Sequence, residues 1–148
     1  MEKDLFETVF VPIADPEDAE QTARAISYYA NPNSEIIVVH VIEKGEGVPD
    51  KAAPSQQEEF AEQAYEAFLE VFPDGWGNVR FVSLYGRDVA KTIIEGAAEA
   101  DATVIAFTPR GGSRWKRLIT GDVARKLIDT SDIPVISLPE QPTSLELE

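Results

Sequence analysis

The sequence of 148 residues contains no cysteine and a single histidine, His40. The absence of cysteine excludes disulfide bonds, thiolate metal ligands and a cysteine nucleophile. With one histidine, a metal site would have to consist almost entirely of carboxylates. Long apolar runs are missing as well, since the longest have the length of β-strands and are too short to cross a membrane. At this chain length, one domain with one sizeable core is expected.

Positive charge is also scarce, because 13 Lys and Arg face 27 Asp and Glu and leave a formal net charge of −14. Such a charge argues against nucleic acids and anionic membrane surfaces as general partners. The N-terminal segment is acidic and lacks the apolar core of a signal peptide, which predicts a cytoplasmic protein. The acidic composition also suggests the hypothesis of a halophilic protein, in which hydrated carboxylates maintain solubility in a salt-rich cytoplasm.

Strand-like apolar runs alternate with segments of helical periodicity along the chain. The run 36–42 is continuously apolar, as expected of a strand covered on both faces, whereas 78–84 alternates in part and is expected nearer the sheet edge. The alternation predicts an α/β fold, namely a single-domain, open, twisted, five-stranded parallel sheet with helices on both faces, in a Rossmann-like arrangement. The domain is expected to span 1–140, with 141–148 as a polar C-terminal tail. The predicted strands are 6–14, 36–42, 78–84, 102–107 and 133–138, and the predicted helices are 19–30, 55–72, 88–100 and one that ends near 128.

The segment 108–128 is the local exception to the acidic composition. Six of the 13 cations fall between positions 110 and 126, where Asp122 is the only acid. The segment carries glycines and connects a predicted strand to a predicted helix, which is a common phosphate-binding geometry because the helix N-terminus presents free N–H groups. A solvated basic helix face is the alternative interpretation. The six cations are Arg110, Arg114, Lys116, Arg117, Arg125 and Lys126.

Other polar residues have simpler interpretations. His40, inside an apolar strand, is more typical of a satisfied core histidine than of a catalytic base. Asp15, Glu17 and Asp18 are typical of the start of a helix. No motif for a nucleophile, a zinc site or a phosphate-binding loop of the Walker type is present, and no base can be assigned to Ser113. The sequence therefore offers little support for an enzyme, at most for a slow ATPase.

Two loop features are considered as candidates for ligand contact. The loop 44–50 carries Gly-x-Gly after a strand, but it lacks the third glycine and the following helix, so it fails as a dinucleotide fingerprint. Trp115, between Arg114 and Lys116, is suited either to stack on a base or to pack on the sheet or a partner.

A family resemblance rests on four segments of the sequence and covers 6–139. These segments are Val11-Pro12-Ile13, His40-Val41-Ile42, Gly86-Arg87-Asp88-Val89-Ala90 and Ile133-Pro134-Val135. With them the chain resembles the universal stress protein family. Nucleotide-binding members of that family carry G-x2-G-x9-G-[S/T] after the fourth strand, and Gly111 and Gly121 match the x9 spacing.

Two positions depart from that motif, since Thr108 stands in the place of the first glycine and Asp122 in the place of the final hydroxyl residue. In nucleotide-binding relatives the glycine lets the backbone approach the nucleotide, and the hydroxyl donates to a phosphate. An ionised Asp122 only accepts hydrogen bonds and repels a phosphate. It would either cap the helix itself or join the phosphates through Mg²⁺. The family's acidic residue after the first strand is displaced, with Ala14 in its place and Asp15 next to it.

The resemblance implies a regulatory stress-response module that binds ATP or another adenine nucleotide across the ends of the first and fourth strands. Gly111 and Gly121 would permit backbone approach, arginines would neutralise phosphates, and Val41 would pack on adenine. The alternative is a dimeric interaction module of the same fold whose degenerate site binds no ATP. The resemblance also implies a homodimer through the last strand, 133–138, whose edge would otherwise be open. The implied nucleotide-contacting residues are Pro12, Ala14, Asp15, Val41, Thr108, Arg110, Gly111, Arg114, Gly121, Asp122 and Val123.

Overall fold

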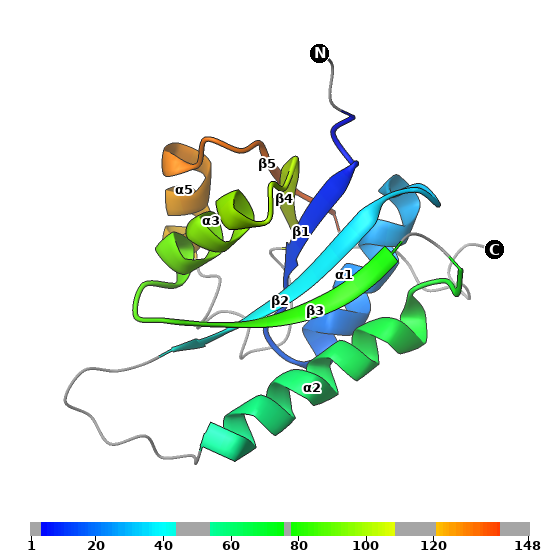
Figure 1. Ribbon diagram of the computed structural model, residues 1–148, viewed down its shortest axis with the longest axis horizontal. Helices are drawn as coiled ribbons and strands as arrows, with labels where there is room; N and C mark the ends of the chain where they lie inside the picture. Colours follow the sequence, from blue (N-terminus) through cyan, green and yellow to red (C-terminus); the bar gives the residue numbers. More distant parts are fainter. Residues whose placement is uncertain (1–3, 44–53, 76–77, 109–120, 140–148) are drawn as a thin grey trace.

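The computed structural model describes residues 4–43, 54–75, 78–108 and 121–139 (Figure 1). Within these ranges strands and helices alternate along the chain, as the sequence predicts. The strands are β1 (Thr8–Pro12), β2 (Glu35–Glu43), β3 (Asn78–Gly86), β4 (Val104–Phe107) and β5 (Val135–Ser137), and the helices are α1 (Pro16–Tyr29), α2 (Pro54–Val71), α3 (Val89–Glu99) and α5 (Gly121–Thr130).

The five strands form one parallel sheet in the order β3-β2-β1-β4-β5. β1 is central, because Val9 lies opposite Ile36 of β2 on one side and Val104 of β4 on the other. β3 and β5 lie at the two edges. The predicted fold class, a single-domain open parallel sheet, is confirmed, and so is the expected place of the third strand at a sheet edge.

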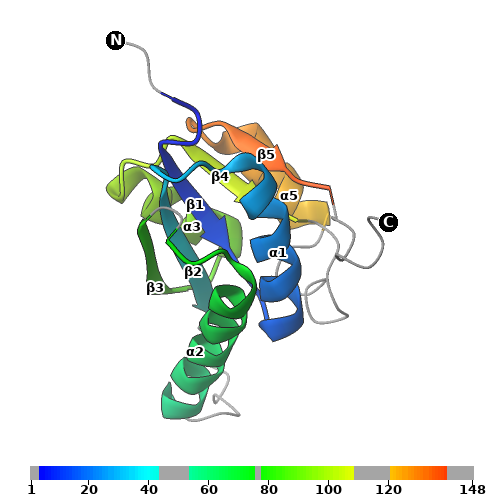
Figure 2. The same ribbon diagram turned by 90° about the vertical axis from the view of Figure 1, so that its right-hand side faces the viewer.

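Successive side chains of the central strands enter two apolar layers, since neighbouring residues of a strand point to opposite faces. α1 and α2 cover one face, and α3 and α5 cover the other (Figure 2). In β2, Ile36 and Val38 face the first layer while Ile37 and Val39 face the second, and all four are fully buried. This two-sided burial explains why β2 is continuously apolar rather than alternating.

The ends of the elements differ from the predicted ranges by a few residues. α1 begins at Pro16, three residues before the predicted 19, because Asp15 caps it and Pro16 has the backbone angle that suits a first helical position. β5 keeps three residues of the predicted six. None of the helices in the described ranges is long and apolar enough to cross a membrane.

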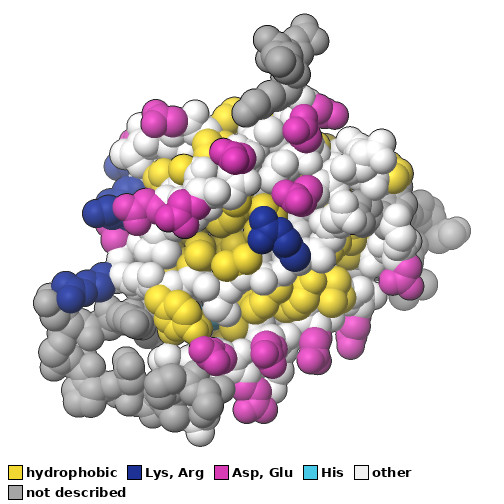
Figure 3. All heavy atoms as spheres, viewed as in Figure 1, with side chains coloured by type: hydrophobic (Ala, Val, Ile, Leu, Met, Phe, Trp, Pro, Cys, Tyr) yellow, Lys and Arg dark blue, Asp and Glu magenta, His cyan; other side chains and the backbone are white. Residues whose placement is uncertain are grey.

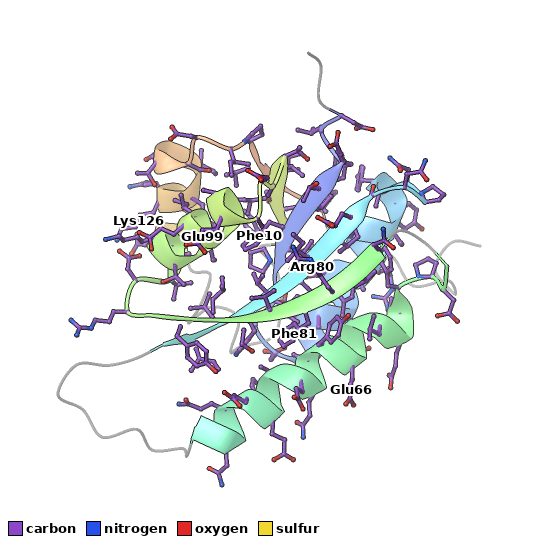
Figure 4. The ribbon with its side chains drawn as sticks, in the orientation of Figure 1. Phe10, Glu66, Arg80, Phe81, Glu99 and Lys126 are labelled. Carbon is purple, nitrogen blue, oxygen red and sulfur yellow. The ribbon has the colours of Figure 1, made fainter. Side chains whose placement is uncertain are left out.

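The solvent-facing side of α2 carries a row of carboxylates. Glu58, Glu62, Glu66 and Glu70 follow one another at every fourth position, and all are exposed. Figure 3 shows this row of acidic side chains along α2, and Figure 4 places Glu66 on the side of α2 away from the sheet. Like charges four residues apart on a helix repel each other, so the row destabilises α2 at low ionic strength.

We predict that Glu66→Lys stabilises the protein by roughly 0.5–1 kcal/mol at low salt, because it replaces two repulsive pairs with two attractive ones. The gain should disappear in molar KCl, where charges are screened within about 3 Å. Wild-type stability itself should rise with KCl. Chemical denaturation at low and high KCl measures both effects.

The matched control is Asp74→Lys, which makes the same change of net charge at an exposed turn position outside the row. An equal gain from Asp74→Lys would attribute the effect to net charge rather than to the α2 row. A wild-type stability that falls on going to molar KCl would contradict the halophilic hypothesis.

Candidate functional site

The carboxyl ends of β1 and β4 lie next to each other at the centre of the sheet. From β1 the chain crosses through α1 on one face to β2, and from β4 it passes through α5 on the other face to β5. The connections that follow these two neighbouring strands therefore lie on opposite faces of the sheet. In open parallel sheets, this point of divergence is where ligands bind.

Asp15 fixes the turn from β1 into α1. Its backbone is extended, with φ −151° and ψ 174°, and its carboxylate accepts a hydrogen bond of 2.8 Å from the backbone N–H of Asp18. The bond satisfies one of the N–H groups that a helix leaves free in its first turn. Just before it, the N–H of Ile13 donates to the carbonyl of Val39 at 2.8 Å, which ties the end of β1 to β2.

Asp18 is a fully buried carboxyl group at the same place. One carboxyl oxygen accepts a 2.9 Å hydrogen bond from the N–H of Ala14, and the other lies 3.4 Å from the hydroxyls of both Thr22 and Thr108. The two threonine hydroxyls are 2.7 Å apart. Asp18 therefore connects the end of β1, the first turns of α1 and the end of β4.

Burial controls the ionisation of Asp18. It raises the pKa of Asp18 to about 8, against the opposing effect of the hydrogen bond from the Ala14 N–H, and the nearby charge of Asp15 raises this pKa further. The hydroxyls of Thr22 and Thr108 lower it. At neutral pH, the favoured form of Asp18 is the uncharged carboxylic acid.

His40 is the only histidine of the sequence, and it is a buried core residue near the carboxyl ends of the strands. Its Nδ1 lies 3.0 Å from the carbonyl oxygen of Ile13, and because a carbonyl only accepts, Nδ1 carries the hydrogen. Burial lowers the pKa of His40 below its usual value. The ring meets Phe60 edge-on at 6.0 Å. These contacts agree with the predicted satisfied core histidine.

The structure divides the implied nucleotide residues between the two faces at these strand ends. Ala14 and Val41 are buried in the layer under α3 and α5, and Val123 packs against the same layer. Asp15 and Thr108 are buried on the side of α1, and Pro12 is the last residue of β1. Arg110, Gly111 and Arg114 lie outside the described residues, as do Ser113, Trp115 and the loop 44–50.

Asp122 is exposed and lies within the first turn of α5, which begins at Gly121. At this position its negative charge interacts favourably with the N-terminal end of the helix dipole. The described residues contain no group of three or more His, Cys, Asp or Glu that is arranged to hold a metal ion.

Sequence reasoning missed the role of Asp18 and Thr22. Asp18, with Asp15 and Glu17, is predicted only as part of the start of a helix, yet of the three only Glu17 is exposed. A signal was available, since Asp18, Thr22 and Ile26 are spaced at four on the buried stripe of α1. An acid on such a stripe predicts a buried hydrogen-bonded carboxyl.

Comparisons with known proteins agree with this architecture. The model of the universal stress protein family matches residues 5–139. Comparison with curated protein sequences gave no match.

Among solved structures, the hypothetical protein MJ0577 is similar, with a TM-score of 0.71 and 18% identity over 95% of this chain and 100% of the other. The universal stress protein of Archaeoglobus fulgidus in complex with dAMP has a TM-score of 0.62 and 20% identity, covering 91% and 99% of the two chains. A universal stress protein in complex with cAMP has a TM-score of 0.61 and 15% identity, covering 89% and 95%. At these identities the structures establish the common fold. The family match over nearly the whole chain shows that this protein belongs to the universal stress protein family.

Proposed function

We propose that the chain is a cytoplasmic regulatory module of the stress response that binds an adenine nucleotide, ATP in particular, at the carboxyl ends of β1 and β4. The observation that carries the proposal is the divergence of the chain at these two adjacent strand ends. Two solved relatives of the same fold are complexes with dAMP and cAMP, which supports adenine as the recognised base.

The two faces at the strand ends suit the two parts of a nucleotide. Ala14, Val41 and Val123 belong to an apolar layer that suits the flat adenine ring. The N-terminus of α5, at Gly121, suits the phosphates. Arg110, Gly111 and Arg114 would complete the phosphate contacts, and Asp122 would help to hold a Mg²⁺ ion that neutralises phosphate charge.

Thr108, in the place of the family's first glycine, is compatible with this arrangement. Its hydroxyl lies 2.7 Å from that of Thr22 on α1, and its side chain is buried on that side of the sheet. The apolar layer with Ala14 and Val41 lies on the opposite face. The extra side chain therefore points away from the face that we assign to adenine.

Ligand binding should be visible as thermal stabilisation. A ligand present at about 100 times its Kd stabilises the native state by roughly 2.7 kcal/mol, which corresponds to a rise in Tm of about 5–10 °C for a chain of this size. We expect this rise with millimolar ATP and Mg²⁺, AMP or cAMP, and little rise with GMP or inorganic phosphate. Equal shifts with GMP would contradict adenine recognition, and no shift with any nucleotide would overturn the proposed function.

Asp122 should limit the affinity for phosphates in the absence of Mg²⁺. We predict that Asp122→Ser tightens ATP binding about fivefold without Mg²⁺, because a like charge about 4 Å away costs roughly 1 kcal/mol in water. With Mg²⁺ the gain should shrink, since the ion uses the carboxylate. Asp129→Ser, an exposed acid near the other end of α5, is the control that removes the same charge. Isothermal titration of both variants measures the difference. If Asp122→Ser binds ATP no better than wild type under either condition, Asp122 does not decide affinity.

A dimeric interaction module is the second candidate function, and the free edge of β5 favours it. The carbonyl of Pro134 and the N–H of Leu138 bond to β4. Because backbone groups alternate along a strand, the N–H and C=O of Val135 and Ser137 point to the outer side. In the described part of the chain no further strand pairs with that side. We propose that a second copy of the chain covers this edge.

Ser137→Pro tests the dimer without disturbing the pairing of β5 with β4, because it removes only an outward-pointing N–H. We predict that light scattering gives a dimer for wild type and for Ser137→Ala, and a monomer for Ser137→Pro. A wild-type monomer at all concentrations would refute the dimer. A Ser137→Pro variant that stays dimeric would place the interface elsewhere.

A further inference from the structure

The three oxygens of Asp18, Thr22 and Thr108 form a closed triangle inside the protein. The two threonine hydroxyls are 2.7 Å apart, and each lies 3.4 Å from the same carboxyl oxygen of Asp18. Three hydrogen bonds around such a triangle require three hydrogens. The hydroxyls supply two of them, so an ionised Asp18 leaves one side of the triangle without a hydrogen.

A proton on Asp18 completes the triangle. Each of the three oxygens then donates one hydrogen bond and accepts one, while the second carboxyl oxygen still accepts from the N–H of Ala14 at 2.9 Å. All polar atoms of the buried group are satisfied in this form, which is the condition under which a buried polar cluster is stable.

The charges around Asp18 also favour the protonated form. Asp15, whose carboxylate caps α1, is the nearest acid and disfavours a second negative charge. His40, on the neighbouring strand β2, is buried, and its pKa is lowered, so it brings no positive charge at neutral pH. Glu17 and Glu20 on α1 are exposed to solvent. Among the described residues no Lys or Arg forms an ion pair with Asp18.

We propose that Asp18 is a positioning residue that keeps a proton at neutral pH and thereby holds Thr108, where the chain leaves β4, against α1. Release of the proton breaks the triangle and frees the end of β4, so that nucleotide affinity falls as the pH rises. The second half of this inference rests on the proposed function, whereas the protonated triangle does not.

The stability test compares wild type with Asp18→Asn, whose amide imitates the protonated acid and cannot ionise. The folded-state pKa of Asp18, about 8, lies above the ordinary aspartate value of 3.8. The stability that Asp18 contributes is therefore fully present below pH 4 and is lost as the pH rises through about 8. We predict that the Tm of wild type falls relative to that of Asp18→Asn between pH 5 and 9. Glu17→Gln, an exposed acid one residue away, should follow wild type.

The affinity test uses AMP as the probe between pH 7 and 9. In this window AMP keeps its charge, since the second phosphate pKa is about 6, and His40 stays neutral. If only molecules with a protonated Asp18 bind AMP, the apparent Kd of wild type rises about tenfold from pH 7 to pH 9. The reason is that at pH 9, one unit above a pKa of about 8, only about a tenth of the molecules keep the proton. The Kd of Asp18→Asn should stay constant over the same pH range. If Asp18 had a merely structural role, the Kd values of the two proteins would not differ in their pH dependence.

The outcomes separate the two proposals. Parallel Tm profiles of wild type and Asp18→Asn would overturn the protonated triangle. A pH-dependent difference in Tm with no AMP binding at any pH would confirm the triangle, and would overturn the proposed function together with the affinity half of the inference. AMP binding with the same pH profile in both proteins would overturn the positioning role. If Asp18→Asn does not fold, wild type alone decides, since its Tm must fall between pH 7 and 9, where other aspartates and glutamates are already ionised.

Discussion

A carboxyl group buried where β1, α1 and β4 meet is the constraint around which this end of the molecule is built. Asp18 accepts from the backbone of Ala14 and contacts the hydroxyls of Thr22 and Thr108, so one side chain joins three elements that are far apart in the sequence. A buried charge without a cation is costly, so burial favours the neutral acid, which keeps its hydrogen bond from the N–H of Ala14 and its contacts with the two hydroxyls. In this highly acidic protein, Asp18 is a carboxyl group that acts in its protonated, uncharged form.

Because of this constraint, the two faces of the sheet differ in polarity at the carboxyl ends of the strands. The α1 side is filled by Asp18 and the two threonines, which satisfy one another. The side under α3 and α5 carries Ala14 and Val41 in an apolar layer. A nucleotide at the divergence of β1 and β4 would meet the apolar side, and the protein's own hydroxyls would occupy the other. Thr108 thus belongs to the scaffold of the proposed site rather than obstructing it.

The sequence predicted the fold well because its signals are local and repeated. The continuous apolar run of β2 and the helical spacing of Val89, Ala90 and Ile93 in α3 each indicate both an element and its buried face. The burial of Asp18 was not predicted because acids after Pro16 are ordinary in a first helical turn, although the residue lies on the buried stripe of α1. Its contact with Thr108 of the β4 end is visible only in the structure. The contact between Asp18 and Thr108 spans 90 positions of the sequence, a distance over which spacing carries no information. Of the implied nucleotide residues, the structure brings Ala14, Val41 and Val123 into one layer.

The most direct test of this account is an NMR titration of the side-chain carboxyl carbon of Asp18 in ¹³C-labelled wild-type protein. The chemical shift of that carbon reports its protonation without any substitution. The account predicts that the Asp18 signal keeps the shift of a carboxylic acid at pH 7 and titrates near pH 8. A signal that titrates below pH 5, with the other aspartates, would contradict it.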